Sequence, residues 1–105
     1  MNNINWIRMV QYMIDVKRKG ENKFLVVVKE GQSKTEYTVT IDQEYYNRLI
    51  GGAISKEKLI EESFKFLLDR ETKESILRRF NLKVINRYFP EYEKTIREKC
   101  NTTRA

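Results

Sequence analysis

The sequence predicts an α+β fold, in which a three-stranded antiparallel meander is followed by four or five helices packed mainly on one face of the sheet. Apolar and polar residues alternate within residues 8–41, the period-two pattern of strands. From residue 42 onward the apolar residues recur at helical spacing. The chain has 105 residues, the length of one domain. We therefore expect a single domain over 1–105, with the sheet over 8–41, a helical part over 42–99 and a frayed tail over 100–105.

Short polar connections that contain glycine separate the three expected strands. The first strand alternates from Val10 to Lys17 and the third from Tyr37 to Ile41, whereas Phe24 to Val28 in the second is apolar on both faces. A strand that is apolar on both faces belongs in the middle of a sheet, so the second strand is placed between the other two. For the start of the chain a helix over Ile4 to Ile14 stays an alternative, because the apolar residues there also fit helical spacing.

The helical part is expected to begin at Asp42, a residue type favoured at helix N-caps. A first short helix should end at Gly51 and Gly52, because glycine readily adopts the left-handed conformation that terminates helices. Ser55 then caps a longer helix from Lys56 to about Arg70, whose apolar residues cover about 200° of the helical wheel. An arc this wide predicts a central helix, packed between the sheet and either the later helices or a second subunit.

Three shorter helices are expected after the central one. Thr72 is placed to cap the first and Asn81 the second, and Pro90 suits the first turn of the last because that position needs no amide hydrogen. The side chains expected to face the core from the first two of these helices are Ile76, Leu77, Phe80, Val84, Ile85, Tyr88 and Phe89.

The helical end contains three recognisable segments, FLLxRE at 66–71, SILRRF at 75–80 and YFPEYE at 88–93. With the hairpin-rich start and the Gly-Gly break, this order resembles a group of short prokaryotic proteins of similar length, and the resemblance covers residues 10–97. That group has no assigned activity. The resemblance therefore implies one whole domain and transfers no functional residue.

The composition excludes several classes of function. The chain has no histidine, the side chain most used as a general acid or base near neutral pH and the commonest transition-metal ligand. Its one cysteine, Cys100, fits a reducing compartment better than a disulfide scaffold. The longest apolar run, Phe24 to Val28, is far shorter than the roughly 20 residues of a membrane span, and no signal peptide is evident. We expect a cytoplasmic protein that makes no membrane contact.

No set of residues predicts catalysis, a cofactor or a metal site. Glu61 and Glu62 are adjacent on a helix and point about 100° apart, so they do not converge on one ion. Gly51 and Gly52 are not followed by the lysine and hydroxyl residue of a phosphate-binding loop. Cys100 has cationic neighbours in the sequence, but no histidine exists to orient it as a nucleophile. We therefore expect no enzymatic activity.

Residues 76–89 contain four basic residues and no acidic one, in a chain whose net charge is +6. All four lie off the apolar stripe of the two expected helices, so they can form one exposed surface suited to phosphate contact, or they can be ordinary surface charges that serve solubility. A helix-turn-helix is disfavoured, because a single residue, Asn81, stands where that motif has a turn of about three or four. This C-terminal basic cluster, the candidate anion or nucleic-acid contact, consists of Arg78, Arg79, Lys83 and Arg87.

A second candidate surface is apolar. Met13, Leu25 and Val27 face away from the side of the sheet expected to cover the core. A small three-layer core can absorb these side chains; if it does not, the remainder is an interface, most often of a symmetric homodimer. We expect a small non-enzymatic binding or scaffolding domain whose partner is another protein or a second copy of the chain. The alternative is a small nucleic-acid-binding protein that uses the C-terminal basic cluster.

Overall fold

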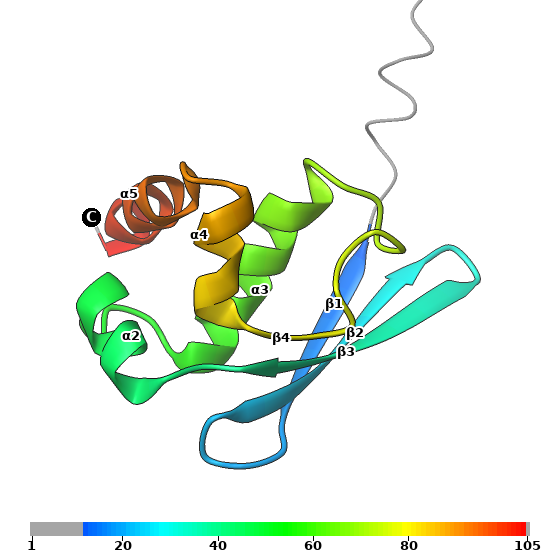
Figure 1. The fold of residues 1–105 in the computed structure, drawn as a ribbon, viewed down its shortest axis with the longest axis horizontal. Coiled ribbons are helices and arrows are strands. Elements are labelled where there is room, and N and C mark those ends of the chain that lie inside the picture. The colour runs from blue at the N-terminus through cyan, green and yellow to red at the C-terminus, as the bar shows by residue number, and fades with distance from the viewer. Residues whose placement is uncertain (1–11, 105) are drawn as a thin grey trace, which may run out of the picture.

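The computed structural model describes residues 12–104, and the helices of that part lie together on one side of a four-stranded mixed sheet (Figure 1). The fold is α+β, with a helical layer on one face of the sheet. The choice between strand and helix for residues 1–11 lies outside the described residues. In chain order the elements are β1 (Met13–Arg18), β2 (Lys23–Glu30), β3 (Ser33–Thr40), α2 (Gln43–Leu49), α3 (Lys56–Leu68), β4 (Arg79–Asn81), the 3₁₀ turn η1 (Leu82–Val84), α4 (Ile85–Tyr88) and α5 (Tyr92–Arg104).

The first three strands form an antiparallel meander with β2 in the middle. Val26 of β2 pairs with Val16 on one side and with Tyr37 on the other, and Val26 and Tyr37 are buried against the helices. Paired residues share a face of a sheet, so this register determines which side chains face the helical layer. Gly31, at φ 63°, occupies the left-handed conformation in the tight turn from β2 to β3.

The expected three-stranded antiparallel sheet is wrong, because β4 adds a fourth strand that pairs in parallel with β3. The backbone amide of Thr38 donates to the carbonyl of Arg78 at 2.8 Å. The strand satisfies backbone groups that the edge of β3 would otherwise leave unpaired. It also places Phe80 beside Val39, where the Phe80 ring packs 6.1 Å from the ring of Phe64.

The segment that leads into β4 also differs from the prediction. The helix expected after Thr72 is absent from the described structure, and the chain from α3 to β4 is an irregular loop with one turn closed by the bond from the Ser75 amide to the Thr72 carbonyl. Ile76 is buried as expected, but Leu77 is 51% exposed. The helical spacing of these apolar residues was therefore coincidental.

Most of the predicted helix ends are confirmed. The Ser55 hydroxyl accepts a hydrogen bond from the Lys58 amide at 3.0 Å, which caps α3. Gly51 and Gly52 have φ values of 62° and 82°, which end α2 in the left-handed conformation. Asp42 stands at the N-cap of α2, but its carboxylate makes no capping bond.

The central helix of the prediction is α3, which lies between the sheet and α5 (Figure 1). On the sheet side the Phe64 ring lies 5.0 Å from that of Tyr37, and on the other side the Phe66 ring lies 5.2 Å from that of Tyr92. Contacts on both sides account for the wide apolar arc of this helix.

The end of the chain departs from the prediction in several places. Pro90, expected in the first turn of the last helix, precedes α5. Asn81 does cap the next turn, since its side chain accepts from the Lys83 amide at 3.1 Å. The helical segment after it is only one 3₁₀ turn and one α-helical turn, and Tyr88, expected inside, is 65% exposed. Cys100, expected in a frayed tail, lies in α5 with its side chain buried.

Candidate interaction surfaces

The C-terminal basic cluster does not form one surface. Successive residues of an extended chain point to opposite sides, and Arg78 and Arg79 obey this rule at the start of β4. The Arg78 guanidinium carbon lies 5.9 Å from the ring centroid of Tyr37, on the helical side of the sheet. Arg79 pairs with Thr38 and shares the opposite side with it.

The other two members of the cluster also differ from each other. Lys83 is already paired, because its ammonium lies 2.9 Å from the Asp42 carboxylate, which also accepts from the Asn81 side-chain amide at 3.1 Å. These bonds lower the pKa of Asp42. Arg87, in the last turn of α4, is exposed and takes part in no ion pair with residues 12–104. The four charges therefore do not act as one phosphate-binding surface.

The face of the sheet opposite the helices has no described helix against it (Figure 1). We call it the outer face. The strand register arranges it in four rows: Met13, Lys29 and Lys34 in the first; Asp15, Val27 and Glu36 in the second; Lys17, Leu25, Thr38 and Arg79 in the third; Lys23, Thr40 and Asn81 in the fourth.

An apolar strip occupies the middle of the outer face. Leu25 and Val27 are successive outward residues of β2, the central strand, and neither belongs to the core cluster under the helices, although Leu25 is half-buried and Val27 is buried between its neighbours on the sheet. Met13 lies diagonally beside Val27 and is 68% exposed. The structure thus places all three residues of the predicted apolar surface on one face, with no described helix against them.

The acidic and basic residues of the outer face lie in different rows. The second row has an acid on each side of Val27, namely Asp15 and Glu36, whereas the rows on both sides of it carry only basic charges. Five basic and two acidic residues give the face a net charge of +3. This pattern is not visible in the sequence alone, because it depends on the register of β1 against β2 and on the presence of β4.

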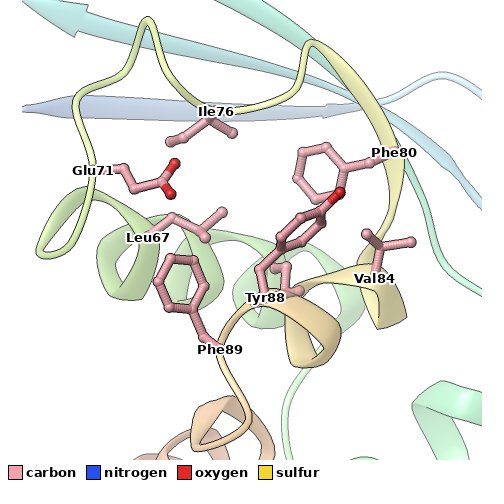
Figure 2. Close-up of a pocket in the computed structure, with 8 residues that line it drawn as sticks. Leu67, Glu71, Ile76, Phe80, Val84, Tyr88 and Phe89 are labelled. Atoms are coloured by element: carbon pink, nitrogen blue, oxygen red, sulfur yellow. The ribbon is translucent and has the colours of Figure 1, made fainter.

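A small hollow lies between the end of α3, the loop before β4 and α4. Figure 2 shows Phe80, Tyr88 and Phe89 pointing toward this space, with Glu71 at its margin. Its volume is about 40 Å³. Pockets that bind small molecules are larger, roughly 300–1,000 Å³, so this hollow is a packing gap beneath an exposed tyrosine rather than a ligand site.

Lys73, in the loop before β4, is the one charged side chain that the described structure buries, at 1% exposure. Its ammonium donates to the hydroxyls of Ser33 and Thr35, at 2.6 and 3.2 Å, and to the Glu74 carboxylate at 2.6 Å. An ammonium has three hydrogens, and each has an acceptor here. Lys73 therefore holds the loop against the start of β3 and has no donor left for a substrate.

A second buried polar group joins α3 to α5. The Ser63 hydroxyl donates to the Leu59 carbonyl at 2.8 Å and lies 2.6 Å from the Tyr92 hydroxyl, which must then be the donor between them. Burial raises the pKa of Tyr92 and also that of Cys100. Both groups are therefore protonated near neutral pH, which makes the Cys100 thiol a poor nucleophile.

The acidic pair of the sequence analysis is part of an ion-pair network along α3. Glu62 lies 3.3 Å from both Lys58 and Lys65 and 3.2 Å from Lys99, and Glu61 lies 3.7 Å from Lys65. Residues 12–104 contain no group of three or more His, Cys, Asp or Glu arranged to hold a metal ion. In the same part of the chain, no helix has the length and apolar character needed to cross a membrane.

Comparison with known proteins gives no match to a protein family, to a curated protein or to a solved structure. The resemblance to the group of short prokaryotic proteins therefore stays a prediction. Any function has to be argued from the surfaces described above.

Proposed function

We propose that this protein is a non-enzymatic binding domain and that the outer face of its sheet is the contact surface. The observation that supports this most directly is the apolar strip. Leu25 and Val27 point away from the helices at the centre of the sheet and lie outside the core cluster beneath the helices; Leu25 is half-buried and Val27 is 9% exposed. Apolar side chains at the centre of a face with charged residues around them are the usual arrangement of a protein interface. The proposal includes a reducing compartment, the cytoplasm, because the one cysteine is unpaired.

The absence of enzymatic activity is part of the proposal. Acid–base and nucleophilic catalysis require a reactive group within hydrogen-bond reach of a partner that orients it. Among the described residues, the buried ammonium of Lys73 has all its donors engaged and the buried thiol of Cys100 has a raised pKa. The hollow beneath Tyr88 is lined almost entirely by apolar side chains. These features support a binding role.

Nucleic-acid binding through the C-terminal basic cluster is the alternative function. The structure gives it less support than the sequence did, because Lys83 is paired with Asp42 and Arg78 and Arg79 point to opposite sides of the sheet. The outer face has the positive charge needed for phosphate contact. However, Asp15 and Glu36 flank its centre, where they would repel a phosphate backbone.

Site-specific photo-cross-linking in the producing cells tests the contact surface. A benzophenone amino acid replaces Lys29, which is exposed on the outer face, and in a matched control it replaces Lys94, which is exposed on α5. We expect a discrete cross-linked protein from position 29 that is lost when Leu25→Asp is added, and none from position 94. Circular dichroism verifies that each variant is folded. Equal cross-linking from the two positions, or none from position 29, would refute the proposed surface.

A further inference from the structure

We infer that the outer face binds a second copy of this chain, in a two-fold arrangement that sets the second row of one copy against the third row of the other. The inference rests on the proposed function of the outer face as a contact surface, and adds the partner and its register. It follows from the symmetry of the rows. In a homodimer with two-fold symmetry each surface meets its own copy, so a face can form such a dimer only if its charges complement themselves.

Two faces that meet are related by a two-fold axis lying in the plane between them. An axis perpendicular to the strands, placed between the second and third rows, lays each strand over the same strand of the other copy. Asp15 of one copy then stands opposite Lys17 of the other, and Val27 stands opposite Leu25. The symmetry produces each of these contacts twice.

The remaining positions of the two central rows also suit this register. Glu36 stands opposite Thr38, directly beside the Arg79 that pairs with Thr38 in the third row. Four aliphatic side chains, two from each copy, therefore meet at the centre, with opposite charges on both sides of them. Like charges meet only at the margin, where Lys29 stands opposite Lys23, and long lysine side chains there can turn toward water.

The competing two-fold arrangement is unfavourable. An axis parallel to the strands keeps each row opposite itself and reverses the order of the strands. When it is centred on β2, it sets Asp15 of one copy against Glu36 of the other, which are like charges. The charges of the outer face thus distinguish between the two arrangements and favour the first.

The charges used in the dimer have no partners within the described part of one copy. Asp15, Lys17, Glu36 and Arg79 are all exposed, and the ion pairs found among residues 12–104 include none of them. By contrast, the helical layer contains acids that are already paired, as Glu62 shows with three lysines. The four outer-face charges are therefore available to a second copy.

The size of the face predicts a weak dimer. β2 and β3 have 8 residues each. β1 and β4 are shorter, with 6 and 3 residues, so at about 3.3 Å per residue and about 4.8 Å between strands the four-stranded face covers roughly 400 Å². Stable interfaces bury about 800 Å² per partner, so we expect reversible association in the range of about 10 μM to 1 mM.

Sedimentation equilibrium over that concentration range tests the dimer and its register. We expect the wild-type chain to dimerise, and Asp15→Lys and Lys17→Asp each to weaken the dimer by about tenfold, because each sets like charges opposite one another twice. The variant with both substitutions restores the opposite charges and should return to within about threefold of wild type. Lys94→Asp, on α5, is the control and should leave the dimer unchanged.

A mixing experiment does not depend on the double variant. The Asp15→Lys chain has two basic groups at these positions and the Lys17→Asp chain has two acidic ones, so an equimolar mixture should form a heterodimer tighter than either homodimer. Failure of both the heterodimer and the double variant to recover association would overturn the register. A wild-type chain that stays monomeric at about 1 mM would overturn the second copy as partner. Cross-linking from position 29 to a different protein would then still support the outer face as the contact surface.

Discussion

The buried hydroxyl pair between α3 and α5 provides a quantitative test of the core. Ser63 donates its hydrogen to Leu59 and accepts one from Tyr92, and both side chains are 0% exposed. Removing one hydroxyl should therefore lower the free energy of unfolding by a different amount from removing the other. Without the Tyr92 hydroxyl, Ser63 keeps its bond to the Leu59 carbonyl. Without the Ser63 hydroxyl, the Tyr92 hydroxyl is buried with no partner.

The magnitudes follow from this asymmetry. Tyr92→Phe should lower the free energy of unfolding by about 0.5–1.5 kcal/mol, the net value of one hydrogen bond. Ser63→Ala should lower it by about 1–3 kcal/mol for the unpartnered phenol, less about 0.5 kcal/mol regained because alanine favours the helix. The double variant removes both polar groups, so its cost should be well below the sum of the two single costs.

Urea denaturation followed by circular dichroism measures the three variants against wild type, with the denaturant slope serving as a test for two-state unfolding. In a chain of this size each kcal/mol should also move the melting temperature by about 4–8 °C. Additive costs of the two substitutions would refute the direct hydrogen bond. A Tyr92→Phe cost above about 1.5 kcal/mol together with a Ser63→Ala cost below about 0.5 kcal/mol would refute the assignment of Tyr92 as the donor.

Three further expectations concern the charges and the thiol. The dissociation constant for mixed-sequence duplex DNA at physiological salt should be no lower than about 10⁻⁴ M, and Lys83→Ala should not change it. Fluorescence anisotropy measures this binding. A slope near about −3 in the logarithm of the association constant against the logarithm of the salt concentration would instead support nucleic-acid binding. Burial opposes ionisation of Glu62, but bonds from lysines outweigh it and lower its pKa, so its stabilisation is present above its unfolded-state pKa and is lost as pH falls through the lower folded-state pKa. Glu62→Gln should therefore flatten the acid decline of the unfolding free energy, and an unchanged pH profile would contradict this. The buried Cys100 thiol should react with a disulfide reagent far more slowly in the native chain than in urea, and equal rates would contradict its burial.

Local signals in the sequence were sufficient for the meander, the capped start of α3 and the Gly-Gly end of α2, because each depends on residues close together in the chain. The strand β4 could not be predicted in this way. Arg79–Asn81 is too short to show an alternating pattern, and it exists because the distant edge of β3 offers backbone partners. Helical spacing from Ile76 to Phe80 therefore gave the wrong element.

The candidate surfaces differ in the same way, because local sequence signals were sufficient for one and long-range strand pairing determined the other. Leu25 and Val27 could be placed outward from the sequence, because a strand that is apolar on both faces must turn one of them away from the helices that cover the other. The rows of charge required the register, which fixes Asp15 beside Val27. The C-terminal basic cluster failed as one surface because its residues were assigned to two helices, whereas Arg79 belongs to a strand.

The parallel pairing of β4 with β3 has a consequence for the order of folding. It joins residues about 40 positions apart in the chain, whereas each hairpin of the meander closes over a few residues, and distant contacts form later because closing a long loop costs more entropy. The meander should therefore assemble first, and β4 should dock only after α3 has brought the chain back to the edge. In the native state the same edge should open first. The Thr38 amide, which bonds to Arg78, should then exchange with deuterium at a lower opening free energy than the amides of β2, and equal protection of the two would show that the sheet opens as one unit.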